Sequence, residues 1–256
     1  MKRLPVSAVL IAKNAAAQLE ACLQSITWAD EIVLLDSGST DATVEIAEAM
    51  GARVFQSDAW PGFGRQRQLA QSYARYDWLF MIDVDERVTP ELQHSIEAVL
   101  QNPDPKKVYR FNRLTDFFGR FMRSSGWYPD RVARLYHAAH FGYDNAAVHE
   151  KVLCSSSDQV DLEGHLLHYT TPSYRGFIDK SARYACDWAE AKHARGKTTS
   201  VAGIIAHTLG TFLRKYLLQR GFLEGRHGFL LASVSSIYTF HKYMALWTLN
   251  QNRDTS

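Results

Sequence analysis

The chain has 256 residues, of which 46% are hydrophobic and 22% charged. This is the composition of an ordinary globular protein, and it excludes a largely disordered chain. The formal net charge of +2 gives no support for nucleic-acid binding, and three widely spaced cysteines predict neither a zinc ribbon nor a disulfide framework.

The first hundred residues alternate between strand and helix patterns. Short apolar runs predict strands at Val6–Ala12, Glu31–Asp36, Arg53–Gln56 and Trp78–Asp83. Helical periodicity follows each of them, at Leu19–Ile26, from about Thr40, at Gly64–Ala74 and from Thr89-Pro90. The apolar stretch before Lys13 is too short for a signal peptide, so we expect it to be the first strand. The alternation predicts an α/β fold with a mostly parallel sheet and flanking helices.

The pattern changes after a turn-rich connector at residues 102–105. Short strands are expected at Val108–Arg113, Ala133–Tyr136 and Leu166–Tyr169, and the chain is predicted to be helical from about Ser173. We therefore predict a sheet domain over residues 1–172 and a helical C-terminal extension over residues 173–256.

Polar residues follow three of the predicted strands, at the sheet edge where ligands bind in such folds. They are Lys13 and Asn14 after the first strand, Asp36, Ser37 and Gly38 after the second, and Asp83 to Glu86 after the fourth. The Asp36 carboxylate is suited to accept a hydrogen bond from a ribose hydroxyl or a base edge. Alternatively, the segment after Asp36 serves only to cap the next helix, and a lysine such as Lys13 is usually a solvated charge.

Asp83 and Asp85 are separated by one residue, directly after a strongly apolar run. Alternate residues of an extended segment point the same way, so the two carboxylates are expected to converge. Convergent carboxylates repel each other unless a cation lies between them, and Mg²⁺ or Mn²⁺ suits such oxygen ligands. The alternative is a pair of solvated loop carboxylates, but the preceding strand and the α/β pattern favour a metal site.

These motifs resemble those of a known family. Three segments are similar to the inverting family 2 glycosyltransferases of GT-A fold, namely Ile11–Asn14, Trp28–Asp41 and Asp83–Glu86. Four further segments resemble the lipopolysaccharide core-biosynthesis branch, the WaaE-like glucosyltransferases, and these are Gly62–Gly64, Gly126–Asp130, Val148–Glu150 and Arg220–Arg226. The resemblance covers nearly the whole chain.

The resemblance implies roles for individual residues. The nucleotide pocket would be lined by Lys13, Asn14, Asp36, Ser37 and Gly38, with Arg65, Gln66 and Asp83 beside it. Asp85 would be a direct metal ligand, with Asp83 and His168 completing the Mg²⁺ or Mn²⁺ shell. Glu150 would be the general base, Asp130 is the second candidate, and Gly126 would support the acceptor side. A surface role for Glu150 and a core role for His168 remain open.

The activity implied is transfer of a hexose, glucose from UDP-glucose, with inversion to a lipid-linked lipopolysaccharide inner-core acceptor. A sugar nucleotidyltransferase is the alternative enzyme class, but such enzymes usually carry a glycine-rich loop after the first strand, where this chain has Ala15–Ala17. A non-catalytic protein that binds nucleotide sugars or membranes is the other alternative.

The C-terminal third is unevenly charged. Residues 207–226 contain Arg214, Lys215, Arg220 and Arg226, and the apolar run Phe229–Phe240 follows. That run is shorter than the roughly 20 residues needed to span a bilayer. The pattern predicts peripheral contact with an anionic membrane surface. The resemblance implies a cytoplasmic protein at the inner membrane. The alternative is that these residues pack against the rest of the protein.

Overall fold

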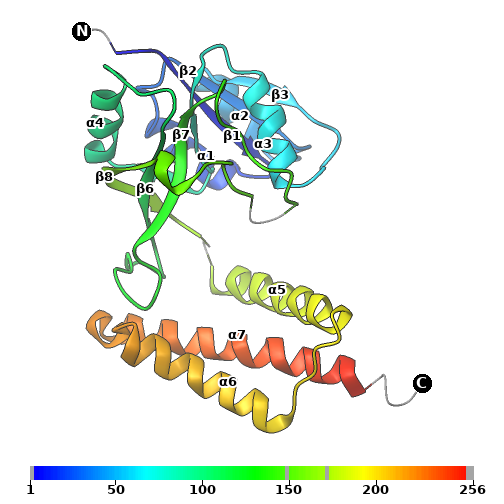
Figure 1. Cartoon of the computed structure of the whole chain (residues 1–256). Coiled ribbons are helices and arrows are strands. Elements are labelled where there is room, and N and C mark those ends of the chain that lie inside the picture. Colours follow the sequence, from blue (N-terminus) through cyan, green and yellow to red (C-terminus); the bar gives the residue numbers. More distant parts are fainter. Residues whose placement is uncertain (1–2, 148–149, 171–172, 252–256) are drawn as a thin grey trace. The chain divides into compact units, whose positions relative to one another are not determined.

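The computed structural model describes residues 3–147, 150–170 and 173–251 (Figure 1). The chain divides into two compact units. Unit 1 comprises the residues up to Leu114 together with Asp130–His168, and unit 2 comprises Thr115–Pro129 and the residues from Tyr169 onward. This division differs from the predicted one, because the loop Thr115–Pro129 groups with the C-terminal helices.

Unit 1 is built on an eight-stranded sheet. Its strands are β1 (Val6–Ala12), β2 (Glu31–Asp36), β3 (Arg53–Gln56), β4 (Trp78–Met81), β5 (Glu86–Val88), β6 (Val108–Thr115), β7 (Asp130–His137) and β8 (Gln159–His168). They lie in the order β3-β2-β1-β4-β7-β6-β8-β5. The first four are parallel, whereas β7 runs antiparallel to β4 and β6, and β5 runs antiparallel to β8. The strands predicted over residues 1–56 match the observed bounds.

Four helices accompany the parallel strands, and they are α1 (Ala16–Gln24), α2 (Thr43–Ala49), α3 (Phe63–Ser72) and α4 (Pro90–Val99). Helix α4 begins as its sequence predicts. The Thr89 hydroxyl accepts a hydrogen bond from the backbone N–H of Leu92 at 3.3 Å, and Pro90 occupies the first turn, where its missing N–H costs nothing.

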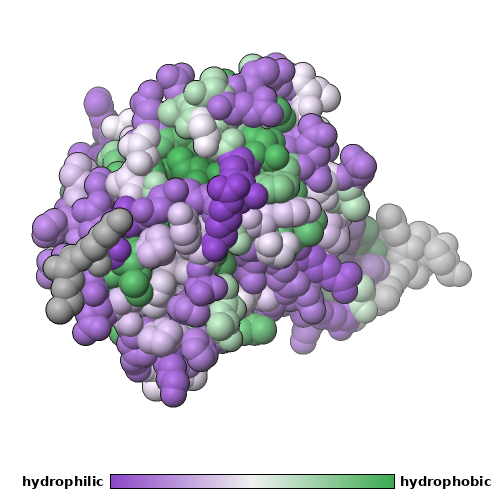
Figure 2. Space-filling view, turned by 90° about the horizontal axis from the view of Figure 1, so that it is seen from above, coloured by the Kyte–Doolittle hydropathy of each residue, from purple (hydrophilic) through white to green (hydrophobic). Residues whose placement is uncertain are grey.

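The core lies on both faces of the sheet, because alternate residues of a strand point to opposite sides. Leu10 of β1 belongs to the cluster that includes the buried residues of α1 and α4. Val9 and Ile11 belong to a second cluster, which includes Ala70 of α3. Helices therefore cover both faces, as predicted. The surface seen in Figure 2 is largely hydrophilic, with hydrophobic side chains in patches between the polar ones.

Unit 2 is helical. Its helices are α5 (Tyr174–Ala194), α6 (Val201–Leu213) and α7 (Arg226–Gln251), and α6 and α7 are linked by the short helical turns η2 (Arg214–Leu218) and η3 (Gly221–Glu224). Helix α7 packs against both α5 and α6. The buried residues Phe117 and Met122 of the loop cluster with Leu231 of α7, which explains why this loop joins unit 2. Among the described residues, no helix is both long and apolar enough to cross a bilayer.

Candidate active site

Asp36 organises the turn after β2. Its Oδ2 accepts hydrogen bonds from the backbone N–H groups of Gly38 (3.1 Å) and Ser39 (2.9 Å), and its Oδ1 accepts one from the Ser39 hydroxyl (2.5 Å). Gly38 has a φ of 82°, a conformation that favours glycine. Asn14, after β1, accepts a hydrogen bond from the Thr40 N–H of the same turn at 2.8 Å. The structure thus brings Asn14 and Asp36 together, although Asp36 is buried and its carboxylate already serves its own turn.

Gln66 links this turn to α3. Its Nε2 donates to the hydroxyl oxygen of Ser37 at 2.9 Å, and both residues are buried. The two cations of the predicted nucleotide pocket, Lys13 and Arg65, are exposed. The predicted pocket residues therefore lie on neighbouring elements, the ends of β1 and β2 and the start of α3, with the two cations at the surface.

The segment after β4 is a turn, whereas the sequence predicts a strand as far as Asp83. The backbone N–H of Glu86 donates to the carbonyl oxygen of Asp83 at 2.9 Å, and the N–H of Asp83 donates to the Glu86 carboxylate at the same distance. Because the chain turns here, the expectation that alternate residues point the same way does not hold. Asp83 contacts arginines, and Asp85 contacts His168.

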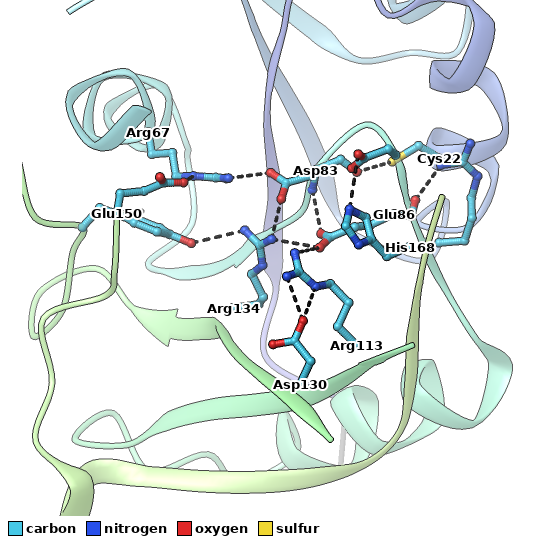
Figure 3. Close-up of polar contacts among 12 residues, drawn as sticks. Cys22, Arg67, Asp83, Glu86, Arg113, Asp130, Arg134, Glu150 and His168 are labelled. Atoms are coloured by element: carbon cyan, nitrogen blue, oxygen red, sulfur yellow. Dashed lines mark hydrogen bonds and ion pairs between the residues drawn. The ribbon is translucent and has the colours of Figure 1, made fainter. Parts of the chain in front are cut away.

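A continuous chain of ion pairs runs through the site (Figure 3). Its members alternate in charge and are, in order, Asp130, Arg113, Glu86, Arg134, Asp83, Arg67 and Glu150. Arg134 Nη2 lies 2.5 Å from Asp83 Oδ2 and 2.9 Å from Glu86 Oε1. Arg67 places Nη2 2.5 Å from Asp83 Oδ1 and Nε 2.7 Å from Glu150 Oε1. One buried guanidinium group therefore joins the Asp83 turn to the predicted base.

Burial and charge act in opposite directions on Asp83. Burial would raise the pKa of its carboxyl group, but the charges of Arg134 and Arg67 outweigh burial and hold the pKa far below its ordinary range. Burial raises the pKa of the Glu86 carboxyl group. The charge of Arg134 opposes this rise, and the charge of Asp83 adds to it. Asp83 is therefore the carboxylate that stays ionised and anchors the two arginines.

Asp85 and His168 form a pair beside this chain of ion pairs. His168 ends β8 in register with Glu86 of β5, and its Nε2 lies 3.3 Å from Asp85 Oδ2. A carboxylate and an imidazole fit a divalent cation that takes its remaining ligands from water and substrate phosphates. The described residues contain no group of three or more His, Cys, Asp or Glu placed to hold a metal. Of the three predicted ligands, Asp85 and His168 lie together, whereas both Asp83 oxygens face arginines; the metal roles of all three stay predictions.

The two candidate bases lie at opposite ends of the ion-pair chain. The Glu150 side chain is 13% exposed and pairs with Arg67, whereas that of Asp130 is 37% exposed and pairs with Arg113 at 2.8 Å. His149, next to Glu150, lies outside the described residues. The structure therefore brings Glu150, and not Asp130, into contact with Arg67, one of the two arginines that hold Asp83.

The loop before Glu150 is fastened to α3. The N–H groups of Phe63 and Gly64 donate to the carbonyl oxygens of Ala147 and Ala146, each at 3.0 Å. A methyl group at Gly64 would lie 2.9 Å from the Ala146 oxygen, so only glycine allows the loop to approach the helix so closely. The glycines of Gly62–Gly64 thus help to place Glu150 beside Arg67.

Gly126 belongs to unit 2. It has a φ of 71°, and the N–H of its neighbour Ser125 donates to the carbonyl oxygen of Gln219 at 2.9 Å. Its implied role on the acceptor side stays a prediction.

Sequence reasoning missed the arginines of this network. Arg67 shares a helical stripe with Gly64 and Ala70, and Arg134 lies inside the strand predicted at Ala133–Tyr136. Charged residues at such positions indicate buried partners, because Arg is almost never fully buried unless it is paired. This signal was available for both residues.

Comparison with known families identifies the family of the chain. Residues 7–156 match the model of the family described as Glycosyl transferase family 2. The chain belongs to glycosyl transferase family 2. The matched region spans β1 to β7 and contains every site residue described above except His168. Membership confirms the predicted fold class, a GT-A type α/β sheet with flanking helices followed by a helical C-terminal region.

Relatives are similar to this glycosyltransferase along nearly its whole length. An "Uncharacterized glycosyltransferase" of Rickettsia bellii is 28% identical over 257 residues, which cover 96% of this chain and 86% of that protein. The "Lipopolysaccharide core biosynthesis glycosyltransferase LpsC" of Rhizobium meliloti is 28% identical over 243 residues, which cover 93% of this chain and 90% of that protein. The second name agrees with the branch that the late motifs resemble.

Solved structures are less similar to this glycosyltransferase. The glucosyl-3-phosphoglycerate synthase from Mycobacterium tuberculosis in complex with Mn²⁺ and UDP-glucose has a TM-score of 0.37 at 27% identity and covers 44% of each chain. S. aureus TarS 1–349 in complex with UDP has a TM-score of 0.49 at 14% identity and covers 98% of this chain and 92% of that chain. Neither likeness is close enough to transfer a ligand to this chain.

Proposed function

We propose that this glycosyltransferase transfers glucose from UDP-glucose, with inversion, to a lipopolysaccharide inner-core acceptor at the cytoplasmic face of the inner membrane. The observation that carries the proposal is the Arg67 guanidinium group, which contacts both Asp83 and Glu150. It joins the turn expected to serve the donor to the residue expected to serve the acceptor. The similarity to LpsC supports the choice of a lipopolysaccharide acceptor.

On the donor side, the turns after β1 and β2 would bind the nucleotide through Asn14, Asp36 and the neighbouring cations Lys13 and Arg65. Mg²⁺ or Mn²⁺ would be held by Asp85 and His168. When bound, the cation offsets the negative charge that develops on the leaving nucleoside diphosphate. Asp83 has a different part in this proposal, since it holds the arginines and not the metal.

On the acceptor side, Glu150 would act as the general base. The acceptor hydroxyl oxygen forms the new bond to the anomeric carbon as the bond to the diphosphate oxygen breaks, and the hydroxyl proton passes to Glu150. Arg67 fixes this carboxylate through Oε1, and Oε2 would take the proton. A single displacement from the face opposite the leaving group inverts the configuration at the anomeric carbon.

Family membership favours sugar transfer over the two alternatives left open by the sequence, a nucleotidyltransferase and a non-catalytic binding protein. The test is to incubate the protein with Mn²⁺, a truncated lipopolysaccharide acceptor and, separately, UDP-glucose and UDP-galactose. Incorporation of glucose with inverted configuration is expected. Transfer of galactose alone would change the assigned donor to UDP-galactose, and transfer from neither nucleotide sugar would contradict the proposal.

The base is tested with Glu150→Gln and its matched control Asp130→Asn. Because proton removal typically contributes about 10²–10⁴-fold to rate, Glu150→Gln is expected to lower kcat by about that factor while leaving donor binding unchanged. Asp130→Asn should retain most of the activity. An active Glu150→Gln protein beside an inactive Asp130→Asn protein would move the base to Asp130.

A further inference from the structure

Helix α6 lies on the outside of unit 2 with most of its surface exposed. It contains no Asp, Glu, Lys or Arg, and it packs against α7. On the packed side Ile204 is buried, and the Thr208 carbonyl oxygen accepts a hydrogen bond from Ser236 at 2.7 Å. A helix with one face already packed in this way is expected to be polar on the other side, and α6 is not.

The exposed side of α6 is apolar along its whole length. Large side chains recur at every fourth position and continue into η2, and all are between 51 and 59% exposed: Val201, Ile205, Leu209, Leu213 and Leu217. Residues four apart lie on the same helix face. They therefore form one stripe of aliphatic side chains that nothing in unit 2 covers among the described residues.

The stripe continues into the turns that follow α6. Leu218 is 80% exposed and Leu223 is 64% exposed. Ring contacts join these turns to both helices, since Tyr216 of η2 lies 5.6 Å from Phe212 of α6 and 5.9 Å from Phe229 of α7, measured between ring centroids. We call this surface the apolar face of unit 2, and it consists of Val201, Ile205, Leu209, Leu213, Leu217, Leu218, Phe222, Leu223, Phe229 and Leu230.

Cations flank the residues of the apolar face along the sequence. Residues 195–251 contain seven Lys or Arg and a single acid, Glu224, whereas the whole chain has a net charge of only +2. Glu224 does not offset these charges at the surface, because it is buried and its Oε2 lies 2.8 Å from Arg120 Nε. The cations beside the apolar residues are exposed, and they are Arg195, Lys197, Arg214, Arg220 and Arg226.

An exposed apolar surface of this extent indicates a binding surface, and the charges select its partner. Two copies of the chain joined through this face about a twofold axis would bring like cations together. An anionic bilayer surface instead offers acyl chains to the aliphatic side chains and phosphate groups to the cations around them. Helix α6 has 13 residues, or about 20 Å of helix, and the hydrocarbon core is about 30 Å thick. This length suits a helix that lies in the interface.

We propose that the apolar face of unit 2 binds an anionic lipid bilayer, with α6 lying in the plane of the interface. This deepens the proposed function, on which it rests for the membrane-linked acceptor, by naming the surface that meets the membrane. It also revises the prediction from sequence, which placed the apolar contribution in Phe229–Phe240 and left α6 out.

The test is flotation of the full chain with vesicles of phosphatidylcholine alone or with added phosphatidylglycerol, without donor or acceptor. The variant Ile205→Glu/Leu209→Glu is compared with Leu153→Glu, which changes a 63% exposed leucine of unit 1. Burial of one such side chain is worth about tenfold or more in partitioning, so the double variant, which removes two, should lose about a hundredfold or more. Leu153→Glu should stay within about twofold of the unchanged protein.

A second variant, Arg214→Gln, tests the electrostatic part. One cation near an anionic surface is worth about 1 kcal/mol, so binding to the anionic vesicles should fall about fivefold. Binding to phosphatidylcholine vesicles should not change. Circular dichroism checks that each variant keeps its helices. We expect that it does, because the substituted side chains are exposed.

The inference would be overturned if the unchanged protein did not float with the vesicles, or if the double variant floated as well as the unchanged protein. It would also be overturned if the protein self-associated, if Ile205→Glu/Leu209→Glu dissociated that form, and if neither protein bound vesicles. Sugar transfer is measured in parallel with a delipidated acceptor. Flotation of the protein without sugar transfer to the lipid-linked or the delipidated acceptor would contradict the proposed function and leave this inference standing. Transfer to the delipidated acceptor without flotation would do the reverse.

Discussion

Arg134 offers the sharpest test of the ion-pair chain. Its side chain is 7% exposed, and one of its nitrogens contacts both Asp83 and Glu86. The substitution Arg134→Met keeps much of the side-chain volume and removes the charge. Removing one partner of a buried ion pair typically costs about 3–5 kcal/mol, because the remaining charge stays buried without compensation.

The remaining contacts place the expected loss near the lower end of that range. Asp83 keeps Arg67 at 2.5 Å, and Glu86 keeps Arg113 at 3.5 Å. We therefore expect Arg134→Met to lower the free energy of unfolding of the sheet by about 3 kcal/mol. The matched control is Arg110→Met on the adjacent strand β6. Arg110 pairs with Asp161, and the two side chains are 25% and 37% exposed, respectively. An exposed pair of this kind is worth about 1 kcal/mol or less.

The measurement is native-state hydrogen exchange of the β4 and β7 peptides, since it reports on the sheet separately from unit 2. The opening free energy of these peptides should fall much further in Arg134→Met than in Arg110→Met. Equal losses in the two variants would show that the buried guanidinium group contributes no more than a surface charge, and the reasoning would fail.

Two further predictions concern unit 1. Burial alone would raise the pKa of Glu31, but hydrogen bonds from a backbone N–H and from Ser7 and Arg53 hold it below its ordinary value of 4.5. Its contribution is therefore present at neutral pH and is lost as the pH falls below about 4.5. Glu31→Gln should cost about 1–3 kcal/mol at pH 7, and urea titrations should show the deficit shrinking toward pH 3; a constant deficit would count against this. Gly64→Ala should displace the loop before the predicted base and lower kcat. The control Gly210→Ala has open space around it in a helix and should stabilise by up to about 1 kcal/mol; equal kcat in both variants would argue against the close approach.

The sequence predicted the local parts of the fold well, because they depend on short-range patterns. The bounds of β1 follow from an apolar run that ends at a polar pair, and the start of α4 follows from Thr89-Pro90. Strand β5 was missed, since its three residues form a strand only by pairing with β8 about 80 residues further along the chain.

The site was predicted in its carboxylates and missed in its arginines. Asp83 and Asp85 stand out after an apolar run, whereas the positions of Arg67 and Arg134 within a helix and a strand give a weaker signal of burial. The burial of Arg67 and Arg134 depends on Asp83, which is 16 and 51 residues away along the chain. The turn that separates Asp83 from Asp85 could not be read from the sequence either, because its closing hydrogen bonds are a property of the folded chain.

In the proposed nucleotide-sugar site, Asp85 and His168 hold the metal, while Asp83 anchors arginines. Isothermal titration of UDP with and without Mn²⁺ tests this most directly, with Asp85→Asn compared against Asp130→Asn. Binding of UDP is expected to depend on Mn²⁺ in the unchanged protein and in Asp130→Asn, and to be lost in Asp85→Asn. Binding of UDP that does not depend on Mn²⁺, or that survives unchanged in Asp85→Asn, would contradict it.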